Sequence, residues 1–246
     1  MKKKPDTSWE NVADWYDKIV GKEGHDYHRT LIYPKLQKSL NKAETVLDIG
    51  SGNGSLRAIL PENTDYIGID ASKTLINNAP KDARSRFIVH DMMKPIPEKL
   101  QADAIYVILS LQNMQDPYLV LRHIAACSKK GAHIHIVLNH PAFRIPRQSS
   151  WGIDSDKDLQ YRRIDRYFSP MEIPITMHPS KKQGPETTSF HFPVSVYVQA
   201  LIDAGFKLEK FEEWLSPKQS SGKTGKRENR ARNEFPLFLF LKGVFV

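Results

Sequence analysis

Residues 46–56 read VLDIGSGNGSL, an apolar run with an aspartate near its end, followed by glycine at every second position (Gly50, Gly52 and Gly54). An apolar strand that breaks into such glycines predicts a tight turn at which the backbone can touch a ligand. Glycine suits this turn because it has no Cβ and tolerates positive φ. The stretch therefore predicts a strand of an α/β sheet with a nucleotide-type ligand at its end.

The spacing of the glycines indicates which ligand to expect. A dinucleotide fingerprint, GxGxxG, requires a third glycine where this chain has Ser55, and here the third glycine comes one residue early, at Gly54. Asp48 places negative charge at the end of the strand, which suits an ammonium or sulfonium better than a phosphate. The residues favour a cationic ligand over a pyrophosphate.

Three later segments each run from an apolar strand into polar residues. Residues 65–70, DYIGID, end at Asp70, whose carboxylate can accept both hydrogen bonds of a ribose diol. Residues 86–91, RFIVHD, end at Asp91, and residues 102–109, ADAIYVIL, lead into SLQNMQDP. In this order and approximate spacing, the four segments resemble the motifs of the class I S-adenosylmethionine-dependent methyltransferases of the small-molecule type.

The resemblance implies S-adenosylmethionine as the cofactor and methyl transfer by in-line displacement as the reaction. It assigns Asp70 to the ribose of the cofactor, and Asp91 with Met92 to the adenine. A tyrosine of the lead-in segment can reach the cofactor in this family, and ADWYD supplies Tyr16. The expected cofactor-binding residues are Tyr16, Asp48, Gly50, Ser51, Gly52, Asn53, Asp70, Ala71, Ser72, Asp91, Met92, Leu109 and Ser110.

Strand and helix patterns alternate from residue 44 onward, which predicts a parallel sheet with helices on both faces. Strands are expected near 45–50, 65–69, 86–90, 103–109 and 132–138, with helices near 54–60, 72–79 and 116–128. A helix at 194–204 and strands at 206–214 and 235–246 match the antiparallel hairpin that closes class I methyltransferase sheets. We therefore expect one doubly wound, Rossmann-like α/β domain over residues 1–246, with the family's seven-stranded order 3-2-1-4-5-7-6, mostly parallel with an antiparallel last strand.

Two segments flank this core. Residues 9–40 place apolar and aromatic side chains at helical spacing and predict an N-terminal helical cap. Within it, the glycine-flanked stretch GKEGHDYH is read either as a surface loop or as a lid over the cofactor. Residues 141–193 form a connection far longer than usual, and their aromatic content argues against disorder. Because this segment follows the fifth strand beside the methyl donor, we expect it to recognise the substrate.

Methyl transfer from a sulfonium depends mainly on alignment and exclusion of water, so no obligatory catalytic side chain is expected. An acceptor hydroxyl or ammonium would need a base, and histidine suits this task at neutral pH. His140, directly after the fifth strand, is the first candidate and His191 the second. The alternative for His140 is a structural hydrogen bond in the turn NHP. One cysteine and scattered histidines predict no metal site.

The formal net charge of +8 comes from two appendages: the lysines at 2–4, and residues 216–233, where six Lys or Arg face one Glu. A neutral body with basic appendages is weak evidence for a polyanion partner, so a small-molecule acceptor is favoured. An RNA or protein methyltransferase that uses a basic loop at 216–233 is a second hypothesis, and a non-catalytic cofactor-binding module is a third. The single cysteine and the absence of a long apolar run predict a cytoplasmic protein with no membrane partner.

Overall fold

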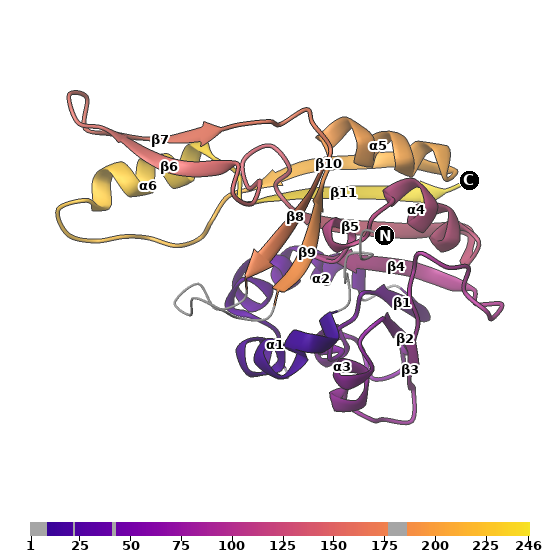
Figure 1. The fold of residues 1–246 in the computed structure, drawn as a ribbon. Helices are drawn as coiled ribbons and strands as arrows, with labels where there is room; N and C mark the ends of the chain where they lie inside the picture. The colour runs from indigo at the N-terminus through magenta and orange to yellow at the C-terminus, as the bar shows by residue number, and fades with distance from the viewer. Residues whose placement is uncertain (1–8, 22, 41–42, 177–185) are drawn as a thin grey trace.

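A seven-stranded sheet forms the centre of the computed structural model, which describes residues 9–21, 23–40, 43–176 and 186–246. Its strands follow the order β10-β11-β5-β4-β1-β2-β3 (Figure 1). Numbered within this sheet alone, the order is 3-2-1-4-5-7-6. Strand β11 is antiparallel to both of its neighbours, and the other pairs are parallel. The predicted fold class and strand order are confirmed.

The elements lie close to the positions that their sequence patterns predict. The strands of the central sheet are β1 (Thr45–Ile49), β2 (Asp65–Asp70), β3 (Ser85–Val89), β4 (Ala102–Ile108), β5 (Ser128–Asn139), β10 (Phe206–Trp214) and β11 (Phe238–Phe245). The α-helices are α1 (Ala13–Val20), α2 (Tyr33–Leu40), α3 (Lys73–Asn78), α4 (Pro117–Ala125), α5 (Val194–Asp203) and α6 (Gly225–Glu234). Shorter helical turns are η1 (Trp9–Val12), η2 (His28–Ile32), η3 (Ser55–Ile59) and η4 (Leu111–Asn113).

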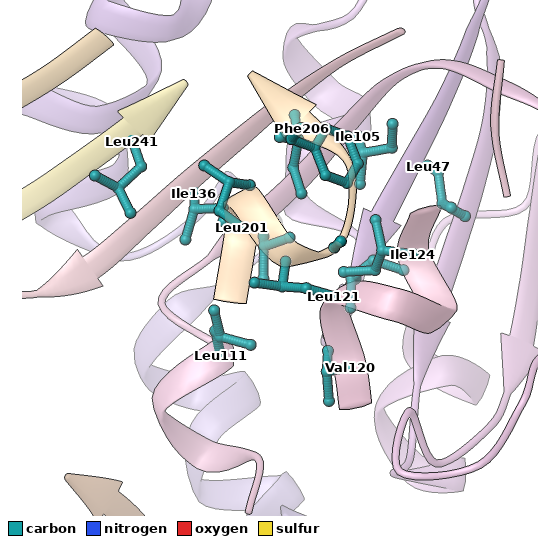
Figure 2. Packing of buried hydrophobic residues seen from close by; sticks show 14 of the residues in the cluster. Leu47, Ile105, Leu111, Val120, Leu121, Ile124, Ile136, Leu201, Phe206 and Leu241 are labelled. Carbon is teal, nitrogen blue, oxygen red and sulfur yellow. The ribbon is translucent and has the colours of Figure 1, made fainter. Parts of the chain in front are cut away.

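Alternation of side chains along the central strands divides the core into two layers. Leu47 and Ile105 point to one face, where they belong to a buried cluster with Leu121 of α4 and other residues of α4 and α5 (Figure 2). Their neighbours Val46 and Tyr106 point to the opposite face and pack in a cluster that includes α2. Both faces of the sheet are therefore covered by helices, as the alternating strand and helix patterns predict.

The inserted segment between β5 and α5 forms two antiparallel hairpins. One consists of β6 (Ser149–Asp154) and β7 (Leu159–Ile164), and the other of β8 (Met171–Thr176) and β9 (Glu186–His191). Strand β9 contacts η1 and η4, so the second hairpin lies against the N-terminal cap and the carboxyl end of β4. The first hairpin projects from the sheet with α6 beside it (Figure 1). The insertion thus reaches the sheet edge at which the glycine turn lies.

Part of the expected basic loop at 216–233 is helical, because α6 occupies Gly225–Glu234. Arg232 pairs with Glu228 one turn earlier at 3.3 Å, a spacing that supports a helix. The last strand accordingly begins at Phe238, three residues later than its apolar pattern predicts. Among the residues that the structure describes, no helix combines the length and apolar character needed to cross a membrane.

Candidate active site

The turn after β1 depends on glycine at each of its alternate positions. Gly50, Gly52 and Gly54 have φ values of +69°, +56° and +75°, a region that other residues rarely adopt. A Cβ on Gly50 would lie 2.3 Å from the Cβ of Ser110, which follows β4. The turn therefore touches the end of β4 only because position 50 has no side chain. The Gly50 N–H donates to the carbonyl of Ile69 at 2.7 Å, which ties the same turn to β2.

Asp70 closes the turn from the end of β2. Its two carboxylate oxygens accept hydrogen bonds from the backbone N–H groups of Gly52, at 2.9 Å, and Ser72, at 2.8 Å. Burial raises the pKa of the Asp70 carboxyl, and these N–H donors oppose that rise. A carboxylate offers about four acceptor positions, so about two are left for the hydroxyls of a ligand. Asp91, after β3, accepts the N–H of Met93 at 3.0 Å.

Asp48 lies behind the glycine turn and is only 4% exposed. Burial raises the pKa of its carboxyl to about 7, the Tyr66 hydroxyl opposes the rise by donating a hydrogen bond at 2.7 Å, and the charge of Asp70 adds to it. The carboxyl is thus a buried group whose ionisation is disfavoured. Its carboxyl accepts the hydrogen bond of Tyr66, and Asp48 does not line the cavity, so the negative charge that the sequence predicts beside the ligand is kept from direct contact with it.

A cavity of about 700 Å³ opens at the carboxyl ends of β1, β2 and β4, within the range of about 300–1,000 Å³ that is usual for small-molecule sites. Most of the predicted cofactor-binding residues line it: Tyr16, Gly50, Gly52, Asp70, Ala71, Asp91, Met92, Leu109 and Ser110. Asp48, Ser51, Asn53 and Ser72 stand outside this lining. Ser72 accepts the Leu75 N–H as the cap of α3, and Asn53 donates to Asp17 at 2.8 Å, so these two hold the walls in place.

Tyr16 covers the glycine turn from the helical cap. Its ring carbon Cε1 lies 3.2 Å from the position that a Cβ on Gly52 would occupy, and its ring packs edge-on against Trp9. Burial raises the pKa of the Tyr16 hydroxyl, and the charges of Asp70 and Asp48 raise it further. Tyr16 therefore stays protonated, and its hydroxyl is a hydrogen-bond donor near Asp70 and Asp48.

His140 and His191 lie outside the cavity lining. The Nε2 of His140 is 2.8 Å from Glu213 Oε1, and its Nδ1 accepts the Ala142 N–H at 3.2 Å, so the ring proton is on Nε2. The Nε2 of His191 is 2.7 Å from the carbonyl oxygen of Tyr167. Burial lowers the pKa of both rings. The alternative of a structural turn histidine accounts for the contacts of His140, and a catalytic role for either ring stays a prediction.

The cap and the insertion supply the rest of the cavity wall. The stretch GKEGHDYH, for which the sequence allows either a surface loop or a lid, contributes to the cavity lining. Its lining residues are His25, Tyr27 and His28. Burial lowers the pKa of His28 to about 4, and the nearby His25 adds to this. Thr187 and Ser189 of β9 also line the cavity. His25, Tyr27 and His28 are therefore part of the site, together with the hairpin β8–β9.

Three cavity-lining arginines, Arg144, Arg147 and Arg162, were not among the residues that the sequence motifs indicated. They lie in the insertion, which carries no recognisable motif, and Arg162 comes to the site from a strand of the projecting hairpin. The available signal was indirect. The insertion follows the fifth strand at the carboxyl edge, and its YRRIDRY run is rich in arginine.

The comparisons with known proteins agree with this geometry. Residues 24–182 match the model of a family described as methyltransferase domain. The chain belongs to this methyltransferase family. No curated protein matches it.

Solved structures with the same fold include several methyltransferases. A putative S-adenosylmethionine-dependent methyltransferase from Listeria monocytogenes is 19% identical, with a TM-score of 0.69 over 87% of this chain and 97% of that one. An S-adenosylmethionine-dependent methyltransferase from Mesorhizobium loti is 23% identical, with a TM-score of 0.66 over 86% and 96%. A glycopeptide N-methyltransferase in complex with S-adenosylmethionine is 12% identical, with a TM-score of 0.57 over 87% and 93%. The fold expected from the class I methyltransferase motifs is confirmed.

We predict that Gly50→Ala costs more stability than Gly131→Ala. Both glycines have positive φ, but a Cβ at Gly131 has nothing within 4 Å, whereas one at Gly50 meets Ser110. Gly131→Ala should lower the free energy of unfolding by about 1 kcal/mol, from backbone strain alone. Gly50→Ala should lower it by about 1–3 kcal/mol more, from overpacking. Urea unfolding of the two variants measures the difference, and equal losses would contradict the close approach of the turn to Ser110.

A second prediction concerns the buried Asp48 carboxyl. Its pKa is about 7 in the folded chain, against an ordinary value of 3.8, so between these values only the folded chain keeps the proton. The free energy of unfolding therefore falls as the pH rises through this window, and the loss persists above pH 7. Relative to Asp48→Asn, the wild type should lose at least about 1.4 kcal/mol between pH 5 and pH 8, the equivalent of one pKa unit.

Urea unfolding at pH 5 and pH 8 tests this slope, with Asp82→Asn as the control. Asp82 is exposed and pairs with Arg57 at 2.9 Å, so its removal should change stability by a similar amount at both pH values. A wild-type protein whose stability relative to Asp48→Asn is constant between pH 5 and pH 8 would show that this carboxyl is ionised throughout.

Proposed function

We propose that this protein transfers the methyl group of S-adenosylmethionine to a small-molecule acceptor held beneath the inserted segment. The observation that carries the proposal is that one cavity is lined by the glycine turn, by Asp70 and Asp91, and by residues of the insertion. Membership of the methyltransferase family supports an enzyme over a non-catalytic module. The complex of the glycopeptide N-methyltransferase with S-adenosylmethionine supports the choice of donor.

The residues at the donor end fit this cofactor. Gly50 and Gly52 leave backbone open to the cavity, where a side chain would fill the space against Ser110 or Tyr16. Asp70 would hold the ribose with the acceptor positions that its backbone bonds leave free. Asp91 would receive the adenine amino group, with Met92 against the ring. When bound, S-adenosylmethionine supplies a methyl group already activated by a sulfonium.

The chain's own contribution is alignment and exclusion of water. The cavity walls come from separate parts of the chain: the cap with Tyr16, the sheet edge with Ser110, and the insertion with Ser189. Ser189 donates to the carbonyl of Gln112 at 3.1 Å, which fastens the hairpin β8–β9 to the turn after β4. Walls tied together in this way hold two reactants in one geometry, and positioning of this kind can supply much of the rate enhancement.

An acceptor that must lose a proton needs a base within hydrogen-bond reach. The sequence points to His140 and His191 for this role, and both rings are engaged with protein partners outside the cavity lining. His25 and His28 reach the cavity from the cap. His90, which follows β3, also lines the cavity. We infer that a histidine base acts either directly from the lining, as His25, His28 or His90, or after His140 or His191 is released from its partner.

A macromolecular acceptor is the weaker proposal. In the basic segment 216–233, Arg227 pairs with Asp158 of the projecting hairpin and Lys218 pairs with Asp26 of the cap. Arg232 donates to Ser220 at 2.7 Å. Half of the segment's basic side chains are thus used to hold the chain to itself. The lysines at 2–4 lie outside the described residues.

We also propose a cytoplasmic location for the enzyme. The buried Cys127 has a free thiol, as is usual in a reducing compartment.

Calorimetric titration with S-adenosylmethionine and with NAD tests the proposed donor. We expect saturable binding of S-adenosylmethionine and none of NAD. Asp70→Asn should weaken binding at least tenfold, because it replaces charge-assisted hydrogen bonds to the ligand with neutral ones. Asp82→Asn serves as the control, because Asp82 is an exposed acid that does not line the cavity. This variant should bind S-adenosylmethionine like the wild type. Tighter binding of NAD, or no binding of S-adenosylmethionine, would overturn the proposal.

A further inference from the structure

The two ends of the cavity carry opposite charge. Asp70 and Asp91, the acids in its lining, stand at the ends of β2 and β3, whereas Arg144, Arg147 and Arg162 line the part built by the insertion. No carboxylate of the described residues forms an ion pair with any of these three arginines. In the described part of the chain, the insertion therefore presents these positive charges to the cavity without a carboxylate paired to them.

Arg162 is held in a fixed orientation. Its Nε donates to the carbonyl of Phe143 at 2.7 Å, and one terminal nitrogen donates to the hydroxyl of Ser149 at 2.7 Å. Its guanidinium also stacks on the Trp151 ring, 4.9 Å from the ring centre. A guanidinium has five N–H donors, so these bonds leave several unused while they fix the plane of the group. An arginine oriented in this way is ready to bind a planar or tetrahedral oxyanion.

Arg144 adds a second positive charge next to the first. Burial lowers the pKa of Arg162, and the charge of Arg144 lowers it further, so the two guanidinium groups repel each other. Burial lowers the pKa of Arg144 as well. Arg147 completes the group with a φ of +60°, a conformation that costs a non-glycine residue about 1–2 kcal/mol. Like charges held close together and a strained backbone, with no carboxylate among the described residues paired to these arginines, are typical of a site that is stabilised by its ligand.

We propose that Arg144, Arg147 and Arg162 form a subsite for an anionic group, a carboxylate or a phosphate, of the methyl acceptor. This inference rests on the proposed function, because it names the acceptor class for the same cavity. The acids at one end suit a cationic donor, and the arginines at the other end suit an anionic acceptor. Paired binding of the two would balance the charge of the site. The cavity volume of about 700 Å³ is in the range that is usual for small-molecule sites, which favours a small acid over a nucleic acid strand.

The experiment measures binding of small anions to the wild type and to three variants. The probes are benzoate and phenyl phosphate, with benzamide as the neutral counterpart of benzoate. The variants are Arg144→Gln, Arg162→Gln and, as a matched control, Arg163→Gln. Arg163 follows Arg162 in β7 and is exposed, and successive strand residues point to opposite faces. Thermal unfolding and calorimetry supply the readouts, and S-adenosylmethionine binding is titrated in parallel for every variant.

At least one of the two anions should stabilise the wild type, and benzamide should not. Arg144→Gln and Arg162→Gln should weaken that anion at least tenfold, whereas Arg163→Gln should change its affinity by less than about twofold. All variants should keep wild-type affinity for S-adenosylmethionine, which separates a failed subsite from a failed donor site. Arg144→Gln without ligand should unfold at the same temperature as the wild type or higher, since it relieves repulsion between like charges.

Four results would overturn the subsite. The first is that neither anion stabilises the wild type more than benzamide does. The second is that the anion binds Arg144→Gln and Arg162→Gln as tightly as it binds Arg163→Gln. The third is that an oligouridylate binds the protein and loses affinity in Arg163→Gln but not in Arg144→Gln, which would place anion recognition on the outer surface and favour a nucleic acid partner. The fourth is a ligand-free Arg144→Gln that unfolds far below the wild type, which would show that this arginine supports the fold.

Discussion

The site depends on one close approach, between the glycine turn after β1 and the end of β4. The virtual Cβ of Gly50 falls 2.3 Å from Ser110, and the Ser110 hydroxyl donates to the carbonyl of Ile49 at 2.6 Å. The turn is fixed on its other side by Ile69 and Asp70 of β2. Three strand ends are thus brought together with exposed backbone between them. Every other part of the cavity is built around this junction.

The charges around this junction are arranged by burial as much as by position. Asp48 is buried behind the turn with its pKa raised to about 7. Burial raises the pKa of Asp70 as well, and the backbone N–H groups of Ser72 and Gly52 oppose that rise. The insertion adds Arg144 and Arg162 to the cavity lining. One cavity therefore offers separate environments to a cation and to an anion. A site with this polarity suits the transfer of a methyl group from a sulfonium to an anionic acceptor.

Sequence patterns predicted the parts of the molecule that depend on local chemistry. The glycine turn, Asp70 and Asp91 were identifiable because a strand and the residue that ends it are adjacent in the chain. The partner of His140 was not, because Glu213 is 73 residues away on β10. The same holds for Arg162, whose orientation is set by Phe143 and Ser149 from another part of the insertion. Helix α6 was missed because its charged residues read equally well as a solvated loop.

We expect the glycine turn, Asp70 and Asp91 to bind the methyl donor, and the insertion to bind the acceptor. Amide hydrogen exchange with and without S-adenosylmethionine tests it most directly, since exchange reports local protection along the whole backbone. We expect slower exchange at residues 50–54, 70–72 and 91–93, with β6–β7 and α6 unchanged. Unchanged exchange at the glycine turn, or protection confined to the insertion or α6, would contradict it.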